Sequence, residues 1–121
     1  MNPVNWFEIP ATDLDRATAF YERVLAVKLR RQEFGGLKMA WFPMEWEAPG
    51  STGALVQQES YIPSYEGSMV YFSVGDIEAA LGRVAENGGK VLKGKTGIGE
   101  YGFVAHFEDS EGNRVALHSV I

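Results

Sequence analysis

The sequence contains two copies of one pattern, in which a short apolar strand is followed by an amphipathic helix and then by further strands. An offset of 63 residues pairs Trp6 with Met69 and Asp13 with Asp76. Few of the paired residues are identical, but residue classes and turn residues match over the whole unit, which chance rarely produces. The repeat therefore predicts one small α+β domain built from two strand-helix-strands modules.

The boundaries of the modules follow from the turn residues. The chain of 121 residues has the length of a single domain. We predict module one over residues 1–58, a linker over 59–67 and module two over 68–121. The linker is proposed because Pro63 and Gly67 interrupt the apolar pattern there.

Both predicted helices show the three-and-four spacing of one buried stripe. The stripe consists of Leu14, Ala17, Phe20, Tyr21, Val24 and Leu25 in module one, and of Ile77, Ala80, Leu81 and Val84 in module two. Thr12 and Asp15 approximate a capping box, whereas Asp13 and Asp76 are expected to be helix caps rather than catalytic acids. The remaining strands are predicted over residues 4–9, 27–31, 37–42, 53–57, 69–74, 91–92, 102–107 and 113–120.

Composition excludes several classes of function. The net charge is −5 and the pI is near 5.0, so we expect no nucleic-acid partner. The chain has no cysteine, which removes disulfides, thiolate metal sites and cysteine nucleophiles. No apolar run approaches the roughly 20 residues that cross a bilayer, and the first residues do not look like a leader peptide. We therefore expect a cytoplasmic protein with no membrane partner.

Two stretches, 7–21 and 107–117, resemble the opening and closing motifs of the vicinal oxygen chelate superfamily, the glyoxalase, bleomycin-resistance and extradiol-dioxygenase group. Residues 70–74 and 87–91 resemble the start of that family's second module. Within the superfamily, the chain is similar to the branch related to lactoylglutathione lyase. The resemblance implies two βαβββ modules whose sheets form a cup with helices on the outer face. It also implies a homodimer.

The same resemblance locates the family's metal ligands. In the enzymes of the family, an inward histidine or glutamate on the first and last strand of each module binds a divalent ion. Carried over by motif, these positions fall on Trp6, Leu55, Met69 and Ala116. None of these side chains is a ligand for such an ion. We therefore predict a member without the usual metal site, and no other cofactor.

Strand alternation assigns residues to the cup. Phe7 and Ile9 should face the helix, which leaves Trp6 and Glu8 facing the cup. The same rule places on the cup face the residues Leu55, Gln57, Met69, Tyr71, Ser73, Ala116 and His118.

A polar layer is expected on this face. It comprises Glu8, Gln57, Tyr71 and His118, with His106 and Trp41 at corresponding places on the third strands of the modules. Such a layer suits a polar or aromatic ligand, or general acid and base catalysis. Two alternatives stay open: a hydrogen-bonded network of buried polar groups, and a weak metal site formed by Glu8, His118 and Gln57.

Three hypotheses follow from this layer. In the first, the protein binds a small molecule in the cup without a metal ion. In the second, it is a lyase or isomerase acting on a 2-oxo or 2-hydroxy compound, with Glu8 as base and His118 or Tyr71 as acid, or with a rearranged metal site. In the third, it is an interaction module with an empty cup.

The glycine-containing segment over residues 93–102 can be interpreted in more than one way. Residues 97–102 spell a dinucleotide-binding loop, but a strand and not a helix is predicted to follow, so we reject that function. Residues 93–102 are instead expected to form either a mobile loop over the cup or an ordinary long turn.

Overall fold

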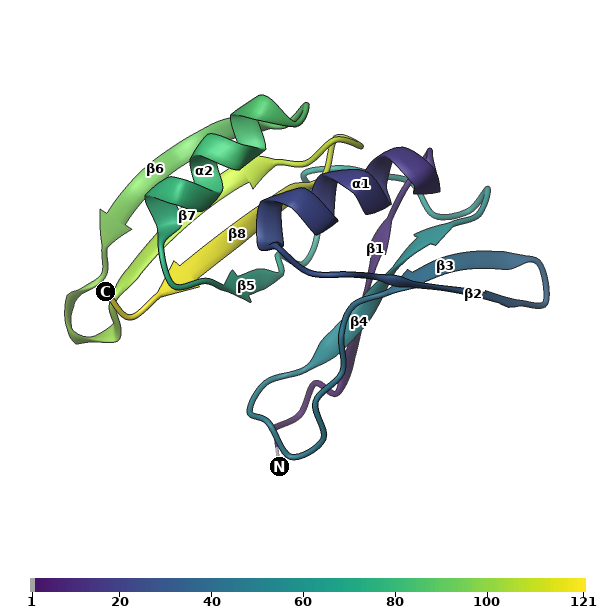
Figure 1. Cartoon of the computed structure of the whole chain (residues 1–121), viewed down its shortest axis with the longest axis horizontal. Helices are drawn as coiled ribbons and strands as arrows, with labels where there is room; N and C mark the ends of the chain where they lie inside the picture. The colour runs from purple at the N-terminus through teal and green to yellow at the C-terminus, as the bar shows by residue number, and fades with distance from the viewer. Residues whose placement is uncertain (1) are drawn as a thin grey trace.

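Two βαβββ modules make up the computed structural model, which describes residues 2–121 (Figure 1). Module one consists of β1 (Trp6–Pro10), α1 (Leu14–Leu25), β2 (Arg30–Phe34), β3 (Leu37–Trp41) and β4 (Thr52–Gln57). Module two consists of β5 (Tyr71–Ser73), α2 (Ile77–Glu86), β6 (Lys90–Gly97), a 3-10 turn η1 (Gly99–Tyr101), β7 (Phe103–Glu108) and β8 (Arg114–Ser119). The predicted α+β architecture of two tandem modules is confirmed.

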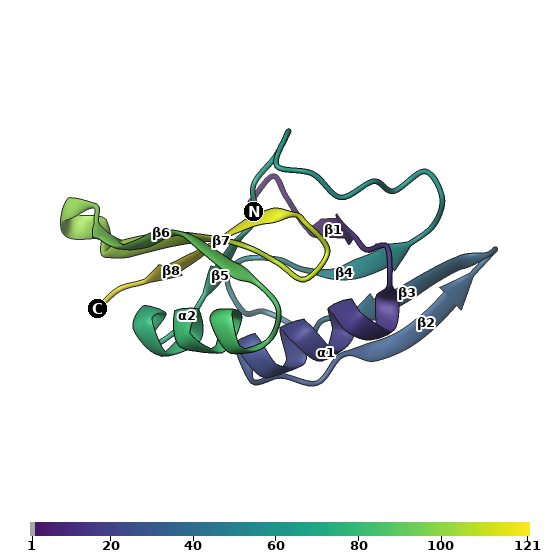
Figure 2. The same cartoon turned by 90° about the horizontal axis from the view of Figure 1, so that it is seen from above.

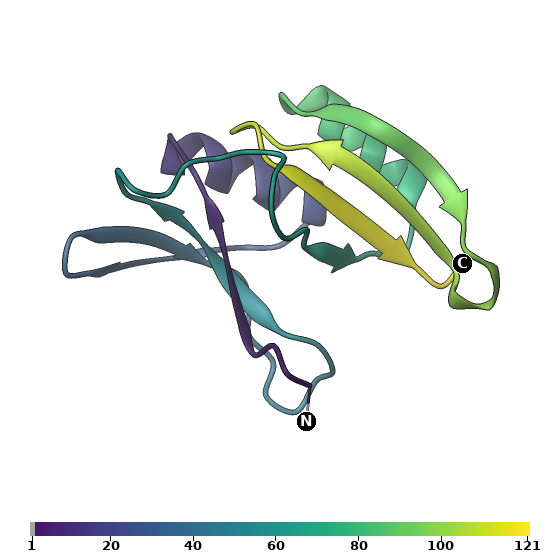
Figure 3. The same cartoon turned by 180° about the vertical axis from the view of Figure 1, so that it is seen from behind.

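Each module forms its own four-stranded sheet, with strand orders β1-β4-β3-β2 and β5-β8-β7-β6. The first strand of each module pairs in parallel with the last, and the other pairs are antiparallel. The two helices pack together on one side of the sheets (Figure 2). We call the opposite side, seen from behind in Figure 3, the strand face. It corresponds to the cup that the sequence predicts.

The two helices begin in the same way, 63 residues apart. The carboxylate of Asp13 accepts a hydrogen bond from the backbone N–H of Arg16 at 3.1 Å, and that of Asp76 accepts one from Ala79 at 3.0 Å. Both aspartates are therefore caps, as predicted. The capping box expected between Thr12 and Asp15 is wrong by one residue, because the cap is Asp13.

An aromatic cluster joins the modules on the helix side of the sheets. The Phe7 ring lies 5.7 Å from the Phe72 ring, and Phe42 lies 5.3 Å from Phe72. Tyr21 of α1 packs against both Phe42 and Phe72, at 5.6 and 5.7 Å. One continuous apolar core therefore runs beneath both helices.

The turn between β7 and β8 reaches from module two to module one. Asp109, only 1% exposed, accepts a 2.6 Å hydrogen bond from the Tyr21 hydroxyl. Asn113 donates to the carbonyl of Pro10 at 2.8 Å and to Asp109 at 2.9 Å. Burial raises the pKa of Asp109, and it raises the pKa of Tyr21 well above the ordinary value.

Glu111 completes this contact at the start of α1. Its carboxylate accepts hydrogen bonds from the backbone N–H groups of Thr12 and Asp13, at 2.9 and 2.8 Å. Arg16 donates two more, at 2.7 and 3.0 Å. We call the group of Tyr21, Asp109, Glu111 and Asn113 the inter-module clamp. It holds module two against the N-terminal end of α1.

Two predicted segments differ from the structure. The strand expected over 27–31 begins only at Arg30. The loop expected over 93–102 is wrong for its first half, because residues up to Gly97 belong to β6 and pair with β7, with two register shifts. The strand expected after Gly102 is confirmed as β7. Among residues 2–121, neither helix is long and apolar enough to span a membrane.

Candidate ligand site on the strand face

The module-one half of the strand face is filled with side chains. Met39, Ala54 and Val56 form a separate apolar cluster and are 6%, 0% and 0% exposed. Trp6 and Trp41 pack against this cluster, and their rings meet edge to face at 5.4 Å. The centre of this half of the face is thus packed.

The segment between β4 and β5 covers part of that packed surface. Figures 2 and 3 show it passing over β1 on the side away from the helices. Tyr61 of this segment packs on the apolar cluster, and its hydroxyl donates to Glu8 at 2.9 Å. The Trp6 indole N–H donates to the same carboxylate at 3.4 Å. The hydrogen bond to Glu8 raises the pKa of Tyr61. Glu8 is therefore engaged by aromatic donors from β1 and from the segment between β4 and β5.

The predicted facing of β4 is wrong. Leu55 pairs in register with Ile9, and both belong to the core beneath the helices. The side chain of Gln57 accepts a 2.7 Å hydrogen bond from the backbone N–H of Leu14, so it caps α1 and does not face the cup. Ala54, the partner of Glu8, faces the cup instead. Alternation failed because β4 is buried on both faces, which leaves no polar side to identify.

The module-two half of the strand face is open. Tyr71, Ala116 and His106 are successive partners across β5, β8 and β7, so they share one row. The small Ala116 separates the two larger side chains, and the Tyr71 and His106 rings lie 6.2 Å apart. His118 follows two residues after Ala116 on the same face. Alternation correctly placed these four residues.

A cavity of about 540 Å³ lies over these rows. Its lining residues include Tyr71, Ser73, Lys93, Val104, His106 and His118. Tyr71 is 49% exposed, so the cavity has an aromatic wall that solvent reaches. Lys93 is the β6 partner of His106 and was missed in the sequence, because its strand resembles a loop. This is the candidate ligand site.

His118 has a defined tautomer. Its Nε2 atom lies 2.6 Å from the backbone carbonyl oxygen of Tyr101, and a carbonyl only accepts hydrogen bonds. Nε2 therefore carries a proton, and Nδ1 is the nitrogen available to a ligand. The turn that carries Tyr101 needs glycine at Gly102, where φ is +100° and a Cβ atom would lie 2.2 Å from the Ser119 carbonyl oxygen.

The surroundings of His106 favour its neutral form. Burial lowers its pKa, and the positive charges of Lys93 and Arg114 lower it further. The ring is therefore neutral near pH 7, with one nitrogen that accepts and one that donates a hydrogen bond.

The residues at the family's metal positions do not fit a divalent ion. They are Trp6, Met69 and Ala116, and on β4 the inward residue is Ala54 in place of Leu55. None of them offers a histidine nitrogen or a carboxylate oxygen. Within residues 2–121, no group of three or more His, Cys, Asp or Glu side chains is placed to hold a metal.

The alternative set of Glu8, His118 and Gln57 is not assembled either. Gln57 points to α1. Glu8 lines a different cavity of about 600 Å³, between the modules, together with Trp6 and Met69. The predicted convergence of Glu8 and Gln57 with Tyr71 and His118 is therefore wrong for the first two residues.

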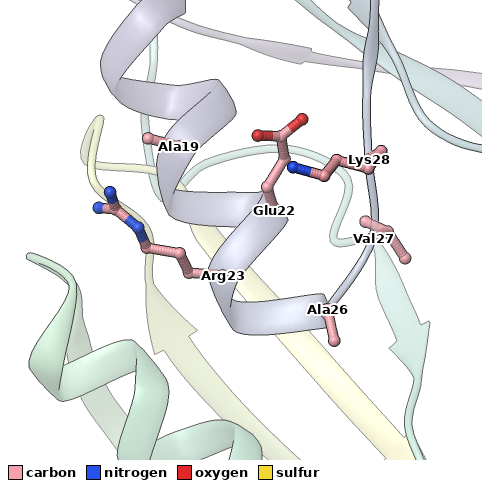
Figure 4. Close-up of a pocket in the computed structure, with 6 residues that line it drawn as sticks. All are labelled: Ala19, Glu22, Arg23, Ala26, Val27 and Lys28. Carbon is pink, nitrogen blue, oxygen red and sulfur yellow. The ribbon is translucent and has the colours of Figure 1, made fainter.

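Two further hollows lie elsewhere on the surface. One of about 830 Å³ shares Tyr71 and Ser73 with the candidate site and adds Trp6, Met44 and Trp46. The other, of about 500 Å³, lies at the C-terminal end of α1 (Figure 4). There Glu22 and Lys28 point toward each other, and Glu22 accepts a hydrogen bond from the backbone of Leu29 at 2.9 Å. This carboxylate thus supports the chain reversal after α1.

Comparisons with known proteins agree with this architecture. The model of the Glyoxalase/Bleomycin resistance protein/Dioxygenase superfamily matches residues 4–117. A glyoxylase-like domain-containing protein of Didymella fabae is 31% identical over 118 residues, which cover 94% of this chain and 91% of the relative.

Solved structures with the same fold include a glyoxylase/bleomycin resistance protein/dioxygenase domain from Frankia sp. EAN1pec. It has a TM-score of 0.75 and 16% identity, with 100% of this chain and 99% of that chain covered. Glyoxalase I from Zea mays has a TM-score of 0.71 and 24% identity over 97% of this chain. The chain spans 46% of the maize protein, about half its length.

Proposed function

This chain belongs to the Glyoxalase/Bleomycin resistance protein/Dioxygenase superfamily, and we propose that it binds a small polar or aromatic molecule without a metal ion. One observation carries the proposal. The cavity lined by Tyr71, His106 and His118 is open, while the family's metal positions on the same face hold side chains that are not ligands for its divalent ion. The narrower relation to lactoylglutathione lyase stays a prediction, as do the homodimer and the cytoplasmic location.

The arrangement favours binding over acid-base catalysis. A lyase or isomerase that uses Glu8 as base needs this carboxylate and His118 or Tyr71 to face one substrate. Glu8 instead accepts hydrogen bonds from Tyr61 and Trp6, and it lines a separate cavity. In our proposal Glu8 therefore orders the module-one surface.

The other residues that the sequence predicts to contact the ligand have different roles in this proposal. Trp6 and Met69 line the cavity between the modules, and Trp6 also lines the hollow that meets the site at Tyr71. Trp41 stabilises the packed half of the face through its contact with Trp6. Leu55 and Gln57 have no contact with the ligand, because they face the helix.

The proposal is tested by thermal unfolding with a library of polar metabolites and antibiotics, in buffer containing EDTA. We expect at least one compound to raise the Tm of the native protein, because a ligand that binds only the folded state stabilises it. The shift should shrink in Tyr71→Ala and in His106→Gln. It should persist in Phe34→Ala, which removes a comparable exposed aromatic side chain outside the cavity, and in Glu8→Gln.

Two results contradict the proposal. One is stabilisation that requires an added divalent metal. The other is the absence of any shift across the library, which favours the interaction-module hypothesis.

A further inference from the structure

The candidate site contains hydrogen-bond donors and one lysine but no carboxylate. Tyr71 and Ser73 contribute hydroxyl groups, Lys93 an ammonium group, and His106 and His118 imidazoles. This contrasts with the chain as a whole, which has 16 acidic and 11 basic residues and a net charge of −5. A hollow that holds a lysine and no acidic residue favours anions locally, although the protein as a whole is acidic.

We propose that this site binds the carboxylate group of a small organic acid. The inference rests on the proposed function and adds the chemical class of the ligand. A carboxylate accepts several hydrogen bonds at once, which matches a cavity rich in donors.

The ring nitrogens of the histidines support this assignment. Because His118 donates from Nε2 to the Tyr101 carbonyl, only its Nδ1 is left for the ligand; this nitrogen accepts a hydrogen bond in the neutral ring and donates one to a carboxylate only in the imidazolium form. His106 lies beside Tyr71 and is the cross-strand partner of Lys93. An anion between these groups offsets the positive charge of Lys93 that now disfavours protonation of His106.

Glu108, the carboxylate of β7, does not neutralise the positive charge of Lys93 in the site. Glu108 lies two residues after His106 on the same face, but it accepts a hydrogen bond from Tyr65 and pairs across the strands with Arg114. Glu100 precedes Tyr101 in η1 and is exposed. Neither acid lines the cavity.

The neighbouring hollow indicates what the carboxylate is attached to. It meets the site at Tyr71 and Ser73, and it adds the apolar surfaces of Trp6, Met44 and Trp46. A ligand with its acid group near His106 would therefore extend an aromatic or aliphatic part toward these side chains. The class is thus an apolar carboxylic acid rather than a highly polar sugar acid.

The experiment uses three probes of similar shape and different charge: benzoate, benzamide and benzylamine. The chain has only two histidines, and both line this site, so their ring signals in ¹H–¹³C NMR spectra report on it without background. We expect benzoate to shift both rings, to raise the pKa of His106, and to bind about tenfold more tightly than benzamide, because charge-assisted hydrogen bonds are stronger than neutral ones.

Lys93→Gln should weaken benzoate binding about threefold and leave benzamide binding unchanged. Lys38→Gln removes the same charge from an exposed position in module one and should change neither affinity.

Equal affinity for benzoate and benzamide, tighter binding of benzylamine, or benzoate binding that leaves both histidine rings unmoved overturns the inference. So does the absence of any ring response to benzoate at millimolar concentration. These results leave the proposed function standing if the compound library still raises the Tm in EDTA and Tyr71→Ala removes that shift.

Discussion

The two modules share one fold but use their strand faces differently. In module one, Met39, Ala54 and Val56 are buried beneath two tryptophans and Tyr61. In module two, Tyr71 is half exposed and lines a cavity with His106 and His118. The helix caps of both modules, by contrast, are equivalent. The repeated scaffold therefore keeps its helix side and differs on its strand side: one half is packed, and we propose that the other half binds the ligand.

The largest expected effect comes from breaking the clamp that holds the halves together. Asp109→Ala leaves the Tyr21 hydroxyl and two backbone N–H groups without their buried acceptor. We expect a loss of about 3 kcal/mol in the free energy of unfolding, measured by urea denaturation. Glu59→Ala, at an exposed position, serves as control. A loss below about 1 kcal/mol for Asp109→Ala contradicts the role of the clamp.

The packed nature of the module-one half predicts the next largest effect. Met39→Ala should cost about 2 to 3 kcal/mol, because it opens a cavity in a buried cluster. Met44→Ala is the matched control, since Met44 is 43% exposed, and it should change stability by less than about 0.5 kcal/mol. Similar costs for the two variants would show that the module-one half is not packed as described.

A smaller effect, dependent on pH, is expected at Glu111. Burial raises the pKa of the Glu111 carboxyl group. The hydrogen bonds from Arg16 and from the backbone of Asp13 lower this pKa by more, so in the folded protein it lies below the ordinary value. The ionised group therefore stabilises the fold above the unfolded pKa, and this contribution is lost as the pH falls through the folded pKa.

Glu111→Gln should thus lower stability by about 1 kcal/mol at neutral pH. The difference from the native protein should narrow below about pH 4.5. Urea denaturation across this pH range measures it, and a difference that grows toward acid contradicts the assigned hydrogen bonds.

The smallest effect on stability is expected in the open half. Tyr71→Ala should change the free energy of unfolding by no more than about 0.5 kcal/mol, because the side chain is half exposed and supports no buried cluster. Tyr61→Ala removes the same side chain from the packed half and should cost about 1.5 kcal/mol. Chemical denaturation of the two variants compares the halves directly, and the reverse order would contradict the comparison.

Sequence alternation correctly predicts which face of an element is buried where the other face of that element is polar. Phe72 packs beneath the helices and Tyr71 faces the cup, as alternation predicts, although alternation did not distinguish the open half from the packed half. It failed on β4, where Ala54, Leu55 and Val56 are all fully buried and either phase fits. It also failed on β6, a mostly exposed edge strand whose lysines and glycines resemble a loop.

Contacts between segments that are far apart in the sequence cannot be predicted from local sequence patterns. Glu111 binds the backbone of Thr12, and Tyr61 binds Glu8, across 99 and 53 residues of sequence. Glu8 was therefore assigned to a polar layer with His118, whereas the segment that carries Tyr61 holds it in module one. Such pairings depend on where the chain passes after β4, which the periodicity of single strands does not encode.

The most direct test of the account is a crystal structure of the protein, purified with EDTA, in complex with a compound that raises its Tm. We predict ligand density between Tyr71, His106 and His118, with no metal ion beside it. Ligand density confined to the module-one half, or a metal ion bridging the ligand to the protein, would contradict the account.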